Sequence, residues 1–240
     1  MRRVAVAVLA VALVVVPAGG AADQARLTVF AASSLTDVLP AIDGRPGYSF
    51  AGSNQLAFQI RQGAPADVFV SAAPSYAREL YRAGLVERPR TFASNALVLA
   101  APRSNPAGIR TVWDLRDKKV QLVVGTASVP IGDYTRRVLR RLGLASVLEK
   151  AVSQEPDVKT IVGKLAVGEA DAGFVYRTDV RAAGGRLRAV SIPAWAQPAI
   201  SYQVAVVRAS RSRAAARAYV ASLSTPRAKR LLRDAGFTVP

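Results

Sequence analysis

After residue 23, short runs of apolar residues alternate with amphipathic stretches. The short runs predict β-strands, and the amphipathic stretches predict helices that bury one face. Strands are predicted at residues 27–31, 48–51, 67–71, 96–101, 120–125, 172–176, 188–192 and 202–207. Helices are predicted at residues 55–62, 74–83, 133–142, 158–168, 211–223 and 227–235. This alternation predicts an α/β protein.

Two stretches with few charged residues, 97–102 and 198–202, predict that the chain crosses twice between two lobes. Lobe one would take residues 23–98 and 202–240, and lobe two would take residues 99–201. Each lobe has roughly 100 residues, which is enough to bury a core of its own.

The first 22 residues have the three-part pattern of a secretory signal peptide. Arg2 and Arg3 form a basic start, residues 4–16 contain only Val, Ala and Leu, and small residues with one Pro follow at 17–22. The apolar run is shorter than the ~20 residues that span a bilayer, although an uncleaved membrane anchor is the alternative. We expect residues 1–22 to be removed and the mature protein to be extracytoplasmic, in the periplasm or at the outer face of the cell membrane.

The composition excludes several kinds of chemistry. The chain has no Cys and no His, which excludes disulfide bonds, thiolate metal sites, Cys nucleophiles and His-assisted triads. A net charge of +17 would suit a nucleic-acid-binding protein. A solvated basic surface is favoured instead, because the protein is expected to be exported and its Arg residues are scattered along predicted helices. Examples are Arg136, Arg137, Arg140 and Arg141. We therefore expect no nucleic-acid partner.

Small hydroxyl residues lie between a predicted strand and a helical pattern in three places. Ser34 and Ser53 occupy the first two junctions, and the loop at the start of residues 125–134 forms the third. A helix start exposes backbone N–H groups and carries partial positive charge, which suits an anion. An ordinary N-cap or connecting loop is the alternative at each junction. Tyr176 ends the predicted strand 172–176, where a Tyr is more often part of the core than a ligand-binding residue.

Four stretches, in this order, resemble the periplasmic molybdate-binding proteins of ABC importers. They are AASSLTD (31–37), FAGSNQLAFQIRQGAPADVFVSA (50–72), VPIGDYTRRVLRRLG (129–143) and GFVY (173–176). The most specific part is QIRQGAPADVF at 59–69, and the resemblance covers essentially the whole mature chain. It implies the type II periplasmic binding protein fold, in which two α/β lobes hold a ligand in the cleft between them.

The resemblance also implies which residues bind. The family holds its oxyanion with hydroxyl groups and backbone amides from both lobes. The matching positions here are the hydroxyls of Ser34 and Ser53, the backbone at Ile131 and Val158, and the phenol of Tyr176. Molybdenum would be bound only as the oxyanion, with no side chain coordinating the metal and no further cofactor.

Two departures from the family pattern affect these expectations. The family often has Ala where this chain has Ile131, so the larger side chain could reshape the pocket while leaving the amide donor in place. The segment between Thr36 and Phe50 is short and interrupted by Pro and Gly. We therefore expect the first helix to be shorter than usual, which weakens the expected contribution of its dipole near Ser34.

The chemistry of the ligand fits the five positions. Molybdate at neutral pH is a dianion that only accepts hydrogen bonds, and none of the five positions is a carboxylate. A protonated phosphate needs an acceptor and would be disfavoured, whereas sulfate would be separated by size. Tungstate is nearly identical to molybdate in size and charge. The expected function is therefore capture of molybdate and tungstate by a monomeric solute-binding protein that delivers them to an ABC transporter permease.

Two alternatives stay open at this point. The same fold could bind another anion, such as sulfate, a phosphonate or a carboxylate, because Ile131 departs from the family pattern. An extracytoplasmic enzyme without His would need a route such as a Ser–Lys dyad. Neither Ser34 nor Ser53 has a Lys at a suggestive spacing, and we expect no catalysis.

Overall fold

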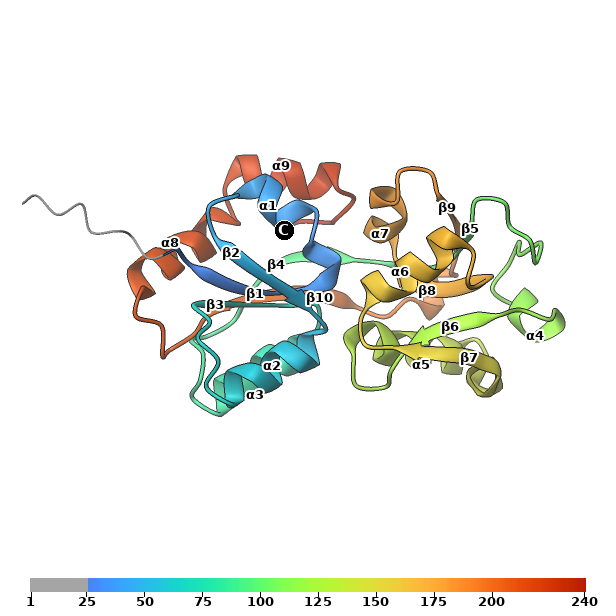
Figure 1. The fold of residues 1–240 in the computed structure, drawn as a ribbon, viewed down its shortest axis with the longest axis horizontal. Helices are drawn as coiled ribbons and strands as arrows, with labels where there is room; N and C mark the ends of the chain where they lie inside the picture. The colour runs from blue at the N-terminus through green and yellow to red at the C-terminus, as the bar shows by residue number, and fades with distance from the viewer. Residues whose placement is uncertain (1–25) are drawn as a thin grey trace, which may run out of the picture.

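The computed structural model describes residues 26–240, and the predicted signal peptide at residues 1–22 lies outside this range. The chain forms two α/β lobes that lie next to each other along the long axis of the molecule (Figure 1). Each lobe contains one five-stranded sheet with helices on its faces. The predicted fold class is confirmed.

The sheet of the first lobe has the strand order β2-β1-β3-β10-β4. Strand β1 pairs in parallel with β2 and β3, whereas β10 pairs antiparallel with β3 and β4. Its strands are β1 (Thr28–Ala32), β2 (Gly47–Ala51), β3 (Val68–Ser71), β4 (Arg90–Asn95) and β10 (Ile200–Val206).

The sheet of the second lobe has the order β7-β6-β8-β5-β9. Strand β6 pairs in parallel with β7 and β8, whereas β5 pairs antiparallel with β8 and β9. Its strands are β5 (Leu97–Pro102), β6 (Leu122–Gly125), β7 (Ala151–Glu155), β8 (Ala172–Tyr176) and β9 (Leu187–Ser191).

Like the strands, the helices fall into two groups, one in each lobe (Figure 1). The first lobe has the short 3-10 helix η1 (Ser33–Leu35), α1 (Val38–Ile42), α2 (Ser53–Arg61), α3 (Pro74–Arg82), α8 (Arg213–Ser222) and α9 (Pro226–Asp234). The second lobe has α4 (Asp114–Asp117), α5 (Pro130–Arg141), η2 (Ala145–Lys150), α6 (Val158–Val167), α7 (Arg177–Ala182) and η3 (Ala194–Ala196). No helix within residues 26–240 is both long enough and apolar enough to cross a membrane.

The two chain crossings between the lobes lie side by side. Strand β4 ends at Asn95 and β5 begins at Leu97, while the returning chain enters β10 at Ile200, which pairs with Asn95. The predicted boundary placed residues 97–98 with lobe one, but both pair with β8 in the second sheet. It also began the return at residue 202, two residues after β10 starts. The crossings are short, so charge-poor stretches located them only to within a few residues.

The predicted strands and helices differ from the observed ones mainly at the sheet edges and the helix starts. Strands β4 and β7 were missed because each is an edge strand with several exposed or half-buried positions and no apolar run. The short helices α4 and α7 were also missed, whereas α1 was expected only as a short first helix without residue bounds. Helix α5 begins at Pro130, three residues before the predicted start, because Pro is well suited to the first helical turn. The expected short first helix is confirmed, since α1 has five residues.

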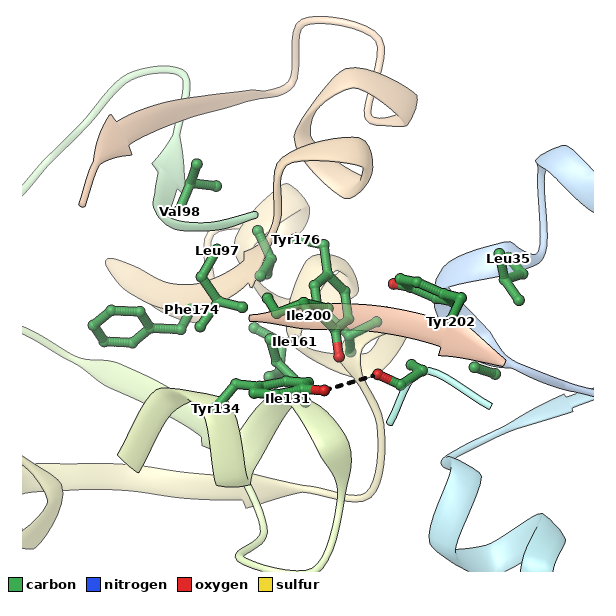
Figure 2. Close-up of a cluster of buried hydrophobic side chains, with 14 of the residues drawn as sticks. Leu35, Leu97, Val98, Ile131, Tyr134, Ile161, Phe174, Tyr176, Ile200 and Tyr202 are labelled. Carbon is green, nitrogen blue, oxygen red and sulfur yellow. Dashed lines mark hydrogen bonds between the residues drawn. The ribbon is translucent and has the colours of Figure 1, made fainter. Parts of the chain in front are cut away.

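Most of the buried apolar side chains form one cluster that extends through both lobes. Figure 2 shows its central part, where Tyr176 and Ile200 lie near the aromatic ring of Tyr202. The rings of Tyr176 and Tyr202 meet edge to face, with centroids 6.0 Å apart. A second cluster lies under α2 and α3, around Leu56, Phe69 and Leu80. Because this cluster is continuous through both lobes, it holds in place the strand ends that meet at the junction between them.

Candidate functional site

A small pocket lies between the lobes, where parallel strands of both sheets reach their carboxyl ends. Such a position is where open α/β sheets bind ligands. The pocket occupies about 220 Å³, including its opening to solvent. It is lined by Ala32, Ser33, Ser34, Ala51, Gly52, Ser53, Ala72, Val129, Pro130, Ile131, Asp157, Val158 and Tyr176. The structure therefore brings all five residues chosen from the sequence into one lining.

Each of these five residues lies at or next to the start of a helix. Ser34 is in η1, Ser53 and Val158 are the first residues of α2 and α6, Ile131 is the second residue of α5, and Tyr176 immediately precedes α7. The first turn of a helix leaves N–H groups without an intrahelical partner and carries partial positive charge. Helix starts from both lobes thus face one small space, which is an arrangement that favours an anion.

Ser53 is held with its hydroxyl proton available. The side chain is 1% exposed, and its Oγ accepts a hydrogen bond of 3.0 Å from the Ala72 N–H. A Ser hydroxyl has one proton to donate and can accept two hydrogen bonds. Since the bond from Ala72 uses an acceptor site, the O–H remains able to donate to a ligand in the pocket.

Ser34 is oriented by a short chain of hydrogen bonds that the sequence did not reveal. The Tyr202 hydroxyl lies 2.9 Å from Ser34 Oγ, and Asn95 Nδ2 donates to the Tyr202 oxygen over 3.4 Å. The Asn95 amide orientation is fixed because its Oδ1 accepts from the Ala96 N–H. Either hydroxyl can donate in the bond between Ser34 and Tyr202; when Tyr202 donates, the Ser34 proton is left for the pocket. Burial raises the pKa of Tyr202 far above its ordinary value, so its hydroxyl stays neutral.

Tyr176 supplies a phenol that lacks a partner. Its side chain is 1% exposed, and its hydroxyl makes no hydrogen bond to any described residue. Burial raises the pKa of Tyr176 well above its ordinary value, so the group remains an O–H donor. The Tyr176 N–H donates to Asp179 Oδ2 over 3.0 Å, and burial raises the pKa of Asp179 to about 7. An unpartnered buried donor beside the pocket is costly unless a ligand accepts from it.

The second lobe also offers backbone amides at the starts of α5 and α6. Pro130 has no N–H, so Ile131 has the first available amide of α5. The Ile131 side chain packs beside Gly125, where a Cβ would lie 2.7 Å from Ile131 Cγ2. Gly125 therefore leaves room for the bulk that departs from the family pattern, and the Ile131 side chain belongs to the buried core. Val158 is likewise buried, at the first position of α6.

One carboxylate belongs to the lining, although none was expected among the binding positions. Asp157 is the N-cap of α6, and its Oδ1 accepts a 3.0 Å hydrogen bond from the Thr160 N–H. This contact directs part of the negative charge toward the positive end of the helix. Asp157 thus stabilises the helix start that carries Val158, at some electrostatic cost to an anion in the pocket.

The lobes touch at the mouth of the pocket. Tyr134 donates from the second lobe to the Ala72 carbonyl of the first lobe over 3.3 Å (Figure 2). Asn54 Nδ2 donates to Ser128 Oγ over 3.3 Å, and the Tyr76 hydroxyl donates to the Ser128 carbonyl. The structure is therefore a closed form, in which Ser128 of the second lobe contacts the first turns of α2 and α3.

An ion pair also joins the two lobes. Lys159 Nζ in the first turn of α6 lies 2.6 Å from Asp37 Oδ2, at the start of α1. Lys159 is thereby held by a carboxylate of the other lobe, and no Lys or Arg is among the residues that line the pocket. Neither serine hydroxyl bonds to a lysine within residues 26–240, so the contacts a Ser–Lys dyad needs are not formed there.

These features define a two-lobed binding protein of the type II periplasmic fold, with a closed pocket of uncharged donors. The family model for bacterial extracellular solute-binding proteins matches residues 27–238. The chain belongs to this family.

Individual relatives agree with this assignment. The molybdate-binding protein ModA of Mycobacterium tuberculosis is 36% identical over 234 residues, which covers 93% of this chain and 88% of the relative. The ModA protein of Escherichia coli is 32% identical over 235 residues and covers 91% of each chain. The resemblance to molybdate-binding proteins inferred from the sequence is confirmed.

Solved structures show the same architecture. The periplasmic molybdate-binding protein of Azotobacter vinelandii superposes with a TM-score of 0.80 at 23% identity, covering 90% of this chain and 100% of that one. The sulfate-binding protein SubI of Mycobacterium tuberculosis superposes with a TM-score of 0.74 at 18% identity, covering 88% of this chain and 86% of that one. The fold is thus shared by proteins whose names specify different anions, and the choice of anion depends on the pocket.

Proposed function

We propose that this protein binds molybdate, and tungstate with it, in the pocket between its lobes. The observation that carries the proposal is that buried uncharged donors from both lobes converge on one space. In particular, the Tyr176 phenol has no acceptor among the described residues. The relatives named as molybdate-binding proteins support this choice of anion.

Neutral donors are sufficient to hold such a dianion. A hydrogen bond to a charged group contributes roughly 1.5–3 kcal/mol. The five donors are the side chains of Ser34, Ser53 and Tyr176 and the amides of Ile131 and Val158. Together they would contribute roughly 7.5–15 kcal/mol, against the ~8 kcal/mol of a micromolar complex, before the costs of ordering and lobe closure are subtracted. No cofactor is needed, and the pocket needs no group that performs catalysis.

Selection among anions follows from the same donors. A proton-bearing phosphate must donate a hydrogen bond, and the one charged acceptor in the lining is Asp157, whose Oδ1 already accepts from the Thr160 N–H, so that only Oδ2 is left for such a proton. Sulfate has the same charge and shape as molybdate but is smaller, so donors fixed at helix starts would fit it less closely. Tungstate, with nearly the size and charge of molybdate, would bind alongside it.

The location and partners follow from membership in an extracellular solute-binding family. We propose that residues 1–22 direct export and that the mature protein works outside the cytoplasm as a monomer. The loaded, closed form would be presented to the permease of an ABC transporter, which would take up the anion when the lobes open. Nucleic acid has no role in this cycle.

Isothermal titration calorimetry on the mature protein tests the proposal directly. Molybdate, tungstate, sulfate and phosphate are titrated separately at equal concentrations. We expect strong binding of molybdate and tungstate and weak or no binding of the other two. Preferential binding of sulfate would instead favour the second candidate, a sulfate-binding protein like SubI, with which the chain shares its fold. Absence of binding for all four anions would refute both.

A further inference from the structure

Gly52 lines the pocket at a position where the backbone does not require glycine. It is the N-cap of α2, with φ −61° and ψ 136°. These angles lie in the extended region that any L-amino acid adopts without strain. The absence of a side chain at Gly52 must therefore serve something other than local backbone conformation.

The space around Gly52 is filled from the other lobe. A Cβ on Gly52 would lie 2.7 Å from the Pro156 carbonyl oxygen and 3.3 Å from Val129 Cγ1. Pro156 immediately precedes Asp157, the N-cap of α6, and Val129 is the N-cap of α5, so both belong to the second lobe. The Pro156 oxygen is part of the backbone and cannot rotate away. A Cβ would also approach Asn54 Oδ1 of its own lobe at 2.7 Å, but that side chain can rotate.

We propose that Gly52 is a positioning residue for anion binding, because only a residue without a side chain lets the two lobes close over the pocket. Gly52 is adjacent to Ser53, and Pro156 is two residues before Val158. The contact between Gly52 and Pro156 thus sets the distance between donors of the first lobe and donors of the second. A methyl group there would wedge the lobes apart at the pocket wall, and donors of the two lobes could no longer reach one ligand at the usual hydrogen-bond distance of about 2.7–3.2 Å. This inference rests on the proposed function for the identity of the ligand.

The substitution Gly52→Ala tests the inference. We expect molybdate affinity to fall at least 10-fold, which is the loss of about one hydrogen bond to a charged group. The dissociation rate should rise while the association rate changes little, because the anion first meets the open form. Without ligand, the unfolding temperature should change only slightly: Ala is compatible with this backbone and restricts the unfolded chain, whereas it is a weaker N-cap than Gly.

Gly163→Ala is the matched control. Gly163 lies within α6, and nothing lies within 4 Å of a Cβ placed on it. The control adds the same methyl group to a glycine at a helix of the second lobe without touching the first lobe. Its binding rates for molybdate should equal those of the parent.

A second measurement follows closure without any ligand. The chain has no cysteine, so Asn54→Cys together with Ser128→Cys introduces a single pair of thiols across the mouth of the pocket. The rate at which a short bifunctional thiol reagent joins them reports how often the lobes close. Asn54→Cys also removes the side chain that would meet a new Cβ from within the first lobe. Adding Gly52→Ala to this pair should slow cross-linking several-fold, whereas adding Gly163→Ala should not.

The two readouts separate the inference from the proposed function. Slower cross-linking with Gly52→Ala supports the inference whether or not the parent binds molybdate. Cross-linking and anion release at parental rates in Gly52→Ala would overturn the inference, even if the parent binds molybdate tightly. Failure of the parent to bind any oxyanion would refute the proposed function, and cross-linking would still decide the role of Gly52.

Discussion

The two lobes contribute different kinds of donor to one pocket. The first lobe offers side-chain hydroxyls at Ser34 and Ser53, whereas the second offers backbone amides at Ile131 and Val158 and one phenol at Tyr176. A hydroxyl donor disappears when its side chain is replaced. An amide donor persists through such a change and depends instead on where its helix begins. Side-chain substitutions should therefore affect the first lobe's part of the site much more than the second lobe's amides.

The two lobes also differ in what orients their donors toward the pocket. The Ser34 hydroxyl is oriented by a hydrogen bond with the Tyr202 hydroxyl, and the Ser53 hydroxyl by a hydrogen bond from the Ala72 N–H. The amide of Ile131 is oriented by the packing of α5, whose buried positions recur at helical spacing through Val138. The first lobe thus depends on a few polar contacts, and the second depends on its hydrophobic core.

The largest effect on binding is expected from the hydroxyls. Ser34→Ala and Ser53→Ala should each weaken molybdate binding by about 1–3 kcal/mol, because each removes a donor to a charged ligand. Calorimetry measures the affinity, and thermal unfolding without ligand should show a loss of stability as well, because the buried Ala72 N–H loses its acceptor in Ser53→Ala and the Tyr202 hydroxyl loses a partner in Ser34→Ala. Ser104→Ala, at an exposed position of the second lobe, is the control. Parental affinity in both Ser34→Ala and Ser53→Ala would show that the site residues are wrongly assigned.

A smaller effect on binding is expected from Tyr202, which contacts Ser34 and does not line the pocket. Tyr202→Phe removes the hydroxyl that orients Ser34 and should weaken molybdate binding by roughly 0.5–1.5 kcal/mol. If Tyr202 acts through Ser34, adding Tyr202→Phe to Ser34→Ala should cost much less than it does alone. Calorimetry on the four proteins of this double-mutant cycle measures the coupling. Additive losses would contradict a role of Tyr202 through Ser34. Tyr81→Phe, at an exposed tyrosine, is the control.

The ion pair between the lobes should have a weaker influence. Lys159→Met breaks the bond to Asp37 and should weaken binding by about 0.2–1 kcal/mol, less at high salt. Asp37→Asn breaks the same pair but leaves the lysine charge in place. Calorimetry at low and high salt should show weakening in both variants if the ion pair helps closure. Tighter binding in Asp37→Asn would show that Lys159 acts only as a nearby positive charge.

The smallest effect on binding is expected at an amide donor. Ile131→Val keeps the amide and removes one buried methylene, so molybdate affinity should stay within about 0.3 kcal/mol of the parent, inside the usual range of a neutral substitution. Stability should nevertheless fall by about 0.5–1.5 kcal/mol, because the side chain packs in the core of the second lobe. Chemical unfolding and calorimetry separate the two quantities. A large loss of affinity with intact stability would show that the side chain itself contacts the anion.

The sequence by itself determined the central strands and the longer helices, and its resemblance to molybdate-binding proteins pointed to five residues that lie in the pocket lining. Parallel strands in the middle of each sheet are apolar on both faces, and strand ends next to Ser34, Ser53 and Tyr176 are visible in the local pattern. Edge strands such as β4 and β7 could not be predicted from the same pattern, because their exposed positions carry little hydrophobic signal.

Only the tertiary structure decided how the donors are aimed and how closely the lobes approach. Ser34 and Tyr202 are 168 residues apart in the chain, yet their hydroxyls are 2.9 Å apart in space. The contact of Gly52 with Pro156 and the bond of Lys159 to Asp37 likewise join distant segments. Hydrophobic periodicity indicates which residues of a single segment are buried. It carries no information about which polar groups two folded lobes bring together, because that depends on the packing of the whole chain.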